Sequence, residues 1–537
     1  MNNKKLIKAV WMLVFLVILS LPNIVALWFD LSSTKLAAIL IPILLFIGLM
    51  RLFNVSKRLL LLIFTPLMML SFMDMNYLIQ FNVHTTPGMY AAIFQSDARE
   101  MSEFAKEAPP IIYLVFFLYL ASWIFLFVFG KQDKRSKQYK RLFTLLLIAL
   151  PIADTIGKGA SRTSFPLGMV TSGYIYATNI ADTQTLVKQR ENFHFQIKAN
   201  SDNTAEKTNI VLVLGETARR DYHSLYGYTR ETNPKLSKRK SLAIFKDAIS
   251  PANATVLSLS TILYMSTAQD RTLFYTTKSI ISLANAANYQ TYWFSAQARF
   301  GKNEATTGST GIEADQSFFI NTGNSILRTY DGKLLPYLSS SIAQQHDKKF
   351  IVLHLYGSHL AYYKRYPKAF RKFTGIAAGF EKHSVYTQQK INEYANSILY
   401  TDFILDSVIE QLDKQKQAAC MVYTSDHGEY LADNINNDFT GHGYPLPHRP
   451  EVEIPLIIWC SDTYQQKHPK KWRAIMANVD KKTNTEDLFF AIADLLDIDF
   501  KLMKKNRSIV NSNYQEPTIR YTRSASNDSV HIYQELK

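Results

Sequence analysis

The first third of the chain is dominated by long apolar segments, which limit the possible folds more than any other feature. Four of them, residues 6–27, 36–50, 59–80 and 110–130, approach or reach the roughly 20 apolar residues that a helix needs to cross a bilayer. A fifth, residues 142–157, is shorter and carries Asp154. We therefore expect residues 1–157 to form a transmembrane domain of five helices.

The distribution of Lys and Arg predicts how these helices are oriented. The amino terminus and the loops at 51–58 and 131–141 are basic, whereas the intervening loops hold Lys35 alone or a mixture rich in acidic residues. Short cytoplasmic loops keep an excess of Lys and Arg. The amino terminus is therefore expected inside, and five crossings place the rest of the chain outside the inner membrane. A cleaved signal peptide at 1–27 fits poorly, because four apolar segments follow and no small-residue cleavage site is evident.

The net charge of +16 is open to several interpretations until the basic residues are located. Because many of them flank the apolar segments, they indicate contact with membrane lipids, and no nucleic-acid partner is expected. Residues 158–200 are interpreted as a connector, which is either a plain linker or an interfacial helix. Residues 201–537 alternate polar and apolar stretches and are expected to form one globular catalytic domain.

The chain contains two cysteines, Cys420 and Cys460, and both lie inside apolar runs. Their surroundings favour buried, unpaired thiols over a disulfide bridge.

Short apolar runs of strand length recur in the globular part. They are continuous rather than alternating, which is typical of strands covered on both faces in a mainly parallel α/β sheet. A helical pattern over 386–415 supplies part of the cover. The expected strands are residues 209–216, 291–296, 350–359, 421–428 and 454–462.

Ligands of such sheets bind beyond the carboxyl ends of the strands. Glu216 lies at the end of the first predicted strand, His359 at the end of the third, and Asp426 with His427 at the end of the fourth. Carboxylate oxygens and an imidazole suit a divalent cation, so we expect these side chains to converge on a metal site. Thr255 begins a run of helical spacing, where backbone N–H groups favour anions, and is a candidate nucleophile. Alternatively, Thr255 or Asn253 serves only as a helix cap.

Five segments carry a resemblance to a known family: VLVLGETARRDYHSLYGYTRETNPKL (211–236), ANATVLSLSTIL (252–263), VLHLYGSHLAYYKRYPKAFRKFT (352–374), YTSDHGEYL (423–431) and GHGYP (441–445). Behind five predicted spans, they resemble the membrane-anchored phosphoethanolamine transferases of Gram-negative bacteria, which belong to the sulfatase and alkaline-phosphatase superfamily. The resemblance implies an α/β/α periplasmic domain of alkaline-phosphatase and sulfatase type.

The resemblance also implies roles for individual residues. Glu216, Thr255, Asp426 and His427 match the positions that hold a catalytic Zn²⁺, and Thr255 matches the nucleophile. His359 and His442 match histidines that bind the substrate phosphate or a second zinc, and either could be the general acid. His354 is expected either to assist in substrate binding or to be a buried structural residue. The implied reaction moves phosphoethanolamine from phosphatidylethanolamine to lipopolysaccharide through a phosphorylated Thr255.

Some positions depart from the family pattern. Pro251 and Thr261 stand where members that modify lipid A carry cysteines, so the core heptose is the favoured acceptor and lipid A remains possible. Leu360 and Ala361 replace the more usual residues after the His359 motif. The basic run at 364–372 either approaches anionic lipopolysaccharide or is a solvated face.

Three other functions compete with this one. A sulfatase requires a Cys or Ser in a C/S-x-P-x-R context, whereas Val256 and Leu257 follow Thr255. A phosphoglycerol transferase shares the fold, metal and Thr and differs mainly in the headgroup. A noncatalytic transporter or scaffold requires no cluster of acids and imidazoles.

Overall fold

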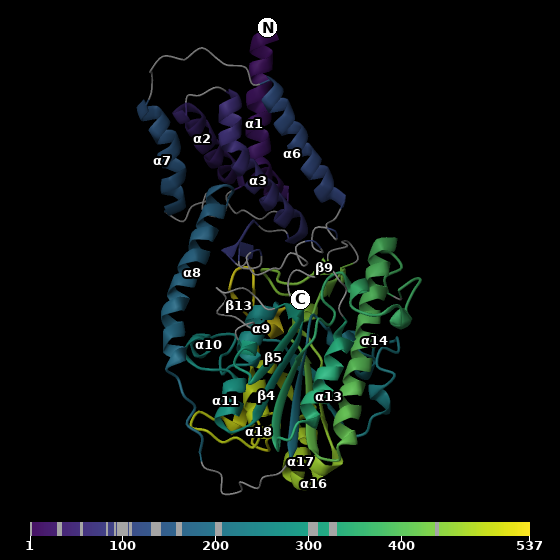
Figure 1. The fold of residues 1–537 in the computed structure, drawn as a ribbon. Coiled ribbons are helices and arrows are strands. Elements are labelled where there is room, and N and C mark those ends of the chain that lie inside the picture. The colour runs from purple at the N-terminus through teal and green to yellow at the C-terminus, as the bar shows by residue number, and fades with distance from the viewer. Residues whose placement is uncertain are drawn as a thin grey trace. The chain divides into compact units, whose positions relative to one another are not determined.

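The computed structural model divides into two compact units, each described here by itself (Figure 1). One comprises residues 1–94 and 105–180, and the other residues 95–104 and 181–537. The residues that the structure describes are 3–28, 35–53, 57–81, 84–87, 89, 90, 93, 102, 106, 110–129, 141–156, 164–198, 207–298, 310–321, 330–377, 379–434 and 440–537.

The first unit has a helix at each predicted apolar segment. The helices are α1 (Asn3–Trp28), α2 (Lys35–Phe53), α3 (Lys57–Phe81), α6 (Pro110–Phe129) and α7 (Arg141–Ile156). Within the described residues, stretches 9–26 and 110–129 are long and apolar enough to cross a membrane, and 145–156 is a shorter apolar helix. The expected helices are therefore present, while five complete crossings stay a prediction. Most of the predicted connector is also helical, as α8 (Leu167–Glu191).

The second unit is built on a seven-stranded sheet. The strand order is β2 (Leu242–Ile244), β10 (Leu456–Cys460), β7 (Ala418–Ser425), β1 (Thr208–Gly215), β6 (Lys348–His354), β4 (Gln290–Ala298) and β5 (Gln316–Asn321). All neighbours are parallel except that β10 is antiparallel to both β7 and β2. The mainly parallel sheet and all five expected strands are confirmed.

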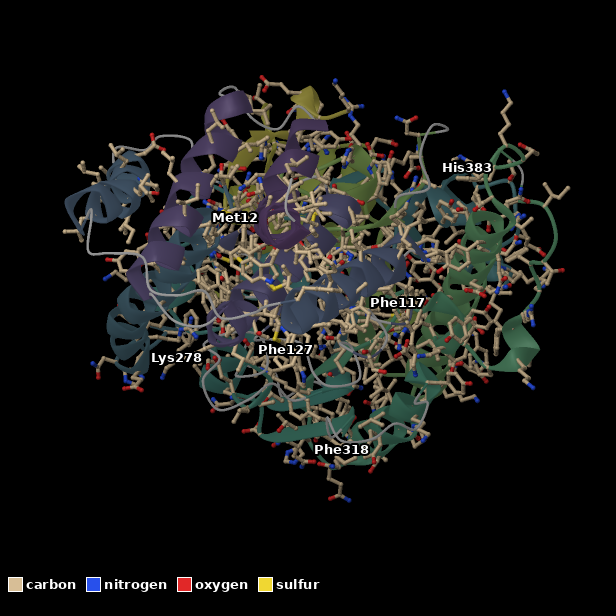
Figure 2. All side chains as sticks on the ribbon, turned by 90° about the horizontal axis from the view of Figure 1, so that it is seen from above. Met12, Phe117, Phe127, Lys278, Phe318 and His383 are labelled. Carbon is tan, nitrogen blue, oxygen red and sulfur yellow. A yellow bond between two sulfur atoms is a disulfide. The ribbon has the colours of Figure 1, made fainter. Side chains whose placement is uncertain are left out.

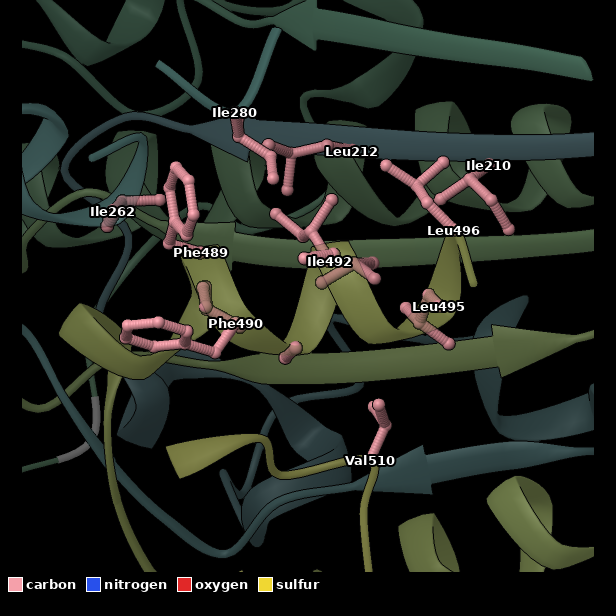
Figure 3. Close-up of a cluster of buried hydrophobic side chains, with 14 of the residues drawn as sticks. Ile210, Leu212, Ile262, Ile280, Phe489, Phe490, Ile492, Leu495, Leu496 and Val510 are labelled. Carbon is pink, nitrogen blue, oxygen red and sulfur yellow. The ribbon is translucent and has the colours of Figure 1, made fainter. Parts of the chain in front are cut away.

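Both faces of this sheet are buried, because successive side chains of a strand point to opposite sides. Ile210 and Leu212 of β1 belong to the core that α9, α11 and α18 cover, and in Figure 3 Ile210 lies next to Leu496 and Leu212 near Ile492. Val211 lies in the other core, which α13 and α14 cover. The covering helices are α9 (Thr255–Ile262), α11 (Ile280–Ala286), α13 (Leu335–Ala343), α14 (Val385–Lys414), α16 (Asp462–Lys467), α17 (Pro469–Asn478) and α18 (Leu488–Leu495).

Helix α14 matches the predicted helix at 386–415 and leads into β7. Its amino terminus is capped by Ser384, whose side chain accepts a hydrogen bond from the Thr387 N–H. Because α14 is followed directly by β7, it runs antiparallel to that strand. Its first turns therefore lie at the carboxyl edge of the parallel strands, where Tyr394 Oη donates to the Thr217 carbonyl over 2.6 Å.

Short elements complete the unit. Three two-stranded sheets pair β3 (Asp247–Ile249) with β11 (Lys482–Asn484), β12 (Tyr521–Arg523) with β13 (Val530–Ile532), and β8 (Tyr430–Leu431) with β9 (Thr440–Gly441). Two short helices are α10 (Thr272–Thr276) and α15 (Arg449–Val452).

The prediction of unpaired thiols was wrong, because Cys420 and Cys460 form a disulfide. The two residues are direct partners on the antiparallel strands β7 and β10, with their Cα atoms 4.2 Å apart. Such close cross-strand pairs are within reach of a disulfide, and an apolar setting does not prevent it. The apolar runs correctly indicated burial but carried no information on the register that joins them.

Candidate metal centre

The acidic residues that follow β1 and β7 meet because these strands are neighbours in register. Gly215 is paired with Ser425, so Glu216 and Asp426 leave the sheet side by side. Glu216 is also approached by the backbone of Gly357, where an added Cβ would lie 2.7 Å from the Glu216 carbonyl oxygen. The predicted convergence at the carboxyl edge is therefore observed.

Four of the predicted site residues form one cluster. His427 Nε2 lies 3.4 Å from both Glu216 Oε1 and Asp426 Oδ2. Thr255, the first residue of α9, places its Oγ1 3.2 and 3.3 Å from the two Glu216 oxygens and 3.3 Å from His427 Nε2. Glu216, Asp426 and His427 are all buried, and their ligand atoms lie within 4.8 Å of one another.

These separations fit a tetrahedral cation. Ligand atoms at about 2.0–2.2 Å from such an ion are about 3.3–3.6 Å from each other. The five separations given above, 3.2–3.4 Å, fall at or near this range. Moreover, Asp426 Oδ2 is buried and makes no hydrogen bond within the described residues, which leaves one carboxylate oxygen for an ion.

The electrostatics of the cluster also favour a bound positive charge. Burial and the nearby Glu216 raise the pKa of Asp426 to about 7. Burial alone would lower the pKa of His427, but Asp426 and Glu216 outweigh it and raise that pKa to about 10. Burial would likewise raise the pKa of Glu216, yet His427 holds it well below its ordinary value. Two buried acids thus require a positive partner, which is either a proton on His427 or a bound cation.

Further hydrogen bonds fix the orientation of these ligands. The His427 imidazole uses Nδ1 to bind the Gly428 carbonyl over 2.7 Å, which leaves Nε2 facing the cluster. Asp426 Oδ1 accepts from the Thr217 and His427 N–H groups. Gln297 Nε2 donates to Glu216 Oε2 over 2.8 Å. Gln297 was not predicted as a site residue, although it lies at the end of β4 and therefore at the same edge of the sheet.

His442 lies beside the cluster. Its ring centroid is 4.2 Å from that of His427 and 6.4 Å from that of His359. Its Nδ1 is bonded to Glu429 over 2.8 Å, and the hydroxyl of Tyr362 donates to the other Glu429 oxygen over 2.6 Å. Glu429 was not predicted as a site residue, although it is the last residue of the SDHGE motif.

His359 is carried by a turn that a buried acid organises. Asp331 accepts hydrogen bonds from the Tyr356 and Gly357 N–H groups, and Arg365 Nε donates to the His359 carbonyl. Of the two unusual residues that follow His359, Ala361 has a left-handed backbone with φ 63°. Leu360 and Ala361 are therefore compatible with the turn that carries His359.

The remaining predictions have mixed outcomes. His354 is buried in β6, 3.2 Å from Ser295 Oγ, and burial lowers its pKa to about 4, so a role in substrate binding stays a prediction. Asn253 does not cap α9, since the cap residue is Ala254 and Asn253 Nδ2 binds Glu451.

The basic run at 364–372 is not one solvated face. Arg365 is buried, with its guanidinium 4.0 Å from the centre of the Tyr356 ring.

Fold and site together define an α/β protein in which three buried residues that could hold a cation lie beside the hydroxyl of a helix residue, Thr255. The sulfatase family model matches residues 208–498, and the chain belongs to the sulfatase family. Phosphoethanolamine transferase EptC of Escherichia coli (strain K12) is 26% identical over 379 residues, which are 68% of this chain and 65% of that relative's length.

Two solved structures are similar. One is the C-terminal periplasmic domain of EptC from Escherichia coli in complex with Zn, with a TM-score of 0.60 and 26% identity over 64% of this chain and 97% of that one. The other is the integral membrane protein lipooligosaccharide phosphoethanolamine transferase A from Neisseria meningitidis, with a TM-score of 0.72 and 19% identity over 94% and 98% of the two chains. The second likeness extends the shared fold to almost the whole chain.

Proposed function

We propose that this protein transfers phosphoethanolamine from phosphatidylethanolamine to lipopolysaccharide, with Thr255 as the transient carrier. The observation that carries the proposal is the Thr255 hydroxyl, which lies 3.2–3.3 Å from Glu216 and His427 at the first residue of α9. A relative named phosphoethanolamine transferase and a Zn complex of a similar domain support it.

Glu216, Asp426, His427 and Thr255 would hold a Zn²⁺ ion, as their separations fit. The ion would supply positive charge that lowers the pKa of the Thr255 alcohol and offsets charge on the phosphoryl oxygens. The first turn of α9 presents backbone N–H groups beside Thr255, and these favour the same anionic oxygens.

The chain's own residues then divide the transfer into two steps. In the first, Thr255 Oγ1, which has already lost its proton to water, forms a bond to phosphorus, and the bond from phosphorus to the diacylglycerol oxygen breaks. His442 gives that oxygen a proton, and its Nδ1 bond to Glu429 keeps Nε2 available for this. In the second, an acceptor oxygen attacks the phosphorus, the bond to Thr255 breaks, and His442 recovers the acceptor's proton. His359 is the alternative acid and a ligand for the phosphoryl oxygens.

The proposed location follows from the substrates. Both donor and acceptor are lipids, so an inner-membrane protein with several spans and a periplasmic catalytic unit would meet both on one surface. The similar EptC domain is described as periplasmic and the similar transferase A as an integral membrane protein. Residues 1–157, 158–200 and 201–537 would then serve as transmembrane domain, connector and catalytic domain. Core heptose is the favoured acceptor and lipid A the second.

Labelled lipids test the proposal. The full-length protein in vesicles is given phosphatidylethanolamine labelled in the ethanolamine or phosphatidylglycerol labelled in the terminal glycerol. We expect ethanolamine label on the wild-type protein and then on lipopolysaccharide, with Thr255→Ser retaining some and Thr255→Ala none. Label from glycerol instead would establish the phosphoglycerol alternative, and unchanged transfer by Thr255→Ala would refute the mechanism. Mass spectrometry of the product then locates the acceptor sugar.

A further inference from the structure

An exposed apolar patch surrounds the amino-terminal end of α14. It consists of Ile376, Val385 and Tyr386, whose side chains are 70%, 83% and 52% exposed, and we call it the α14 patch. His383, labelled in Figure 2, lies in the same segment, just before the Ser384 cap. None of the three residues contributes to the buried cores of this unit. Exposed apolar groups gathered at one place commonly mark an interaction surface.

Two of the polar side chains near this patch, Asn392 and Asn396, already make hydrogen bonds within the fold. Ile376 and Val385 line a surface hollow of about 370 Å³. Asn392, in its floor, accepts from Arg230 and donates to the Gly375 carbonyl. Asn396 accepts from two backbone N–H groups and donates to the Phe373 carbonyl. These two amides are therefore not free to hydrogen-bond the hydroxyl groups of a sugar, while Ile376 and Val385 leave apolar surface exposed at the hollow.

The rim of the patch carries charges of both signs, with basic groups in excess. Arg371 and Glu393 line the hollow, and Lys382 and Glu381 are exposed close by in sequence. Lys372 is also exposed and pairs with Glu231 over 3.1 Å. The ammonium of the largely buried Lys390 lies 4.7 Å from the centre of the Tyr386 ring. Apolar tips surrounded by Lys and Arg, with a Tyr at the boundary, suit the interface of a bilayer that contains anionic lipids.

The patch lies at the same end of the catalytic unit as the metal centre. Nine residues of α14 separate Val385 from Tyr394, or about 13 Å of helix, and Tyr394 is bonded to the backbone that follows Glu216. A bilayer contact at the α14 patch would therefore keep the carboxyl edge of the sheet close to the lipid headgroups.

We propose that the α14 patch docks onto the bilayer surface. Ile376 and Val385 enter the boundary between headgroups and acyl chains, and Arg371 pairs with lipid phosphates. The part that this contact plays in catalysis rests on the proposed function, whereas the contact itself does not.

Spin-label depth measurement tests the contact directly. The Val385→Cys variant of the full-length protein is spin-labelled at position 385 and placed in nanodiscs of phosphatidylcholine and phosphatidylglycerol. The accessibility of the spin label to oxygen is then compared with its accessibility to a water-soluble nickel chelate. The native cysteines are paired and leave no background label. The control is Leu502→Cys. Leu502 is 42% exposed and follows α18. The carbonyl of Leu496, at the end of α18, accepts a hydrogen bond from Tyr289, which comes just before β4. Leu502 therefore belongs to the edge of the sheet opposite the carboxyl edge.

We expect oxygen to dominate at position 385 and the nickel chelate at 502. Equal access of the chelate to both positions would overturn the proposal, as would protection of position 385 only after lipopolysaccharide is added. The latter result would identify a glycolipid site instead.

Activity gives a second readout. Val385→Glu should raise the KM for phosphatidylethanolamine in anionic vesicles several-fold and leave cleavage of a soluble phosphodiester unchanged, while Leu502→Glu changes neither. If the wild type transfers no phosphoethanolamine but the label at 385 is in lipid, the proposed function fails and the docking stands. An unchanged KM together with an aqueous label refutes the docking.

Discussion

Gly357 is the position at which a single methyl group should disturb the metal centre most selectively. It follows β6, has φ +52°, and donates its N–H to Asp331. A Cβ there would lie 2.7 Å from the carbonyl oxygen and 2.8 Å from the nitrogen of Glu216. These are backbone atoms and cannot rotate away. We therefore predict that Gly357→Ala displaces Glu216, although no ligand is itself changed.

The expected loss of folding stability in Gly357→Ala has two parts. A non-glycine residue in the left-handed region costs about 1–2 kcal/mol, and an extra methyl in a packed site costs about 1–3 kcal/mol. Together they should destabilise the unit that contains the sheet by about 2–5 kcal/mol. The clash of the added methyl group displaces Glu216 itself, so zinc affinity should also drop by about 10–100-fold. This is the size expected when a group that supports a metal ligand is lost.

The control is Gly227→Ala, because Gly227 also has a positive φ, of +99°, yet a Cβ there would meet nothing within 4 Å. It should show only the backbone cost and bind zinc normally. Thermal unfolding of the full-length protein measures stability, and competition with a chromophoric chelator measures zinc affinity. Equal stability and equal zinc affinity of the two variants would refute the close-approach argument.

Three further predictions concern neighbouring groups. Gln297→Leu removes the hydrogen bond to Glu216 and should lower zinc affinity about 10–100-fold by chelator competition, whereas the surface variant Gln389→Leu should not. His442→Gln should slow labelling of Thr255 about 10²–10⁴-fold, and Glu429→Gln should slow it less; equal rates to wild type would exclude His442 as the acid. Burial lowers the pKa of His223 to about 4 in the folded protein. As the pH drops below about 6.5, His223 therefore takes up a proton in the unfolded chain before it does so in the folded protein. The free energy of unfolding should fall by about 3 kcal/mol between pH 6.5 and pH 4. His223→Gln should remove this part of the pH dependence of the unfolding midpoint, while replacement of exposed His346 should leave it.

The sequence predicted the sheet well because its signals are local. The apolar runs of β1, β6 and β7 are continuous, and each ends in a chemically distinctive residue at the carboxyl edge. Parallel pairing then brings Glu216 and Asp426 together without further information. Thr255 could also be placed at the start of α9, because a run of helical spacing begins there.

Interactions that depend on register could not be predicted in the same way. The partnership of Cys420 with Cys460 requires that β10 run antiparallel to β7 in one particular alignment. A one-residue shift would put the thiols on opposite faces. Gln297 and Glu429 were missed for a related reason, since each acts by supporting another side chain and has no chemical signature of its own.

The metal centre also concentrates features that a fold normally avoids. Two acids, Glu216 and Asp426, are buried together, one of their oxygens lacks a hydrogen bond within the described residues, and Thr217, just after Glu216, has φ 60°. The buried charges and the unpaired oxygen cost free energy in the absence of a cation, and the left-handed backbone costs it with or without one. Two well-packed cores on either side of β1 hold the cluster in place despite that cost. A bound cation would offset the cost where it arises, so removal of metal should loosen this edge of the sheet while the cores stay folded.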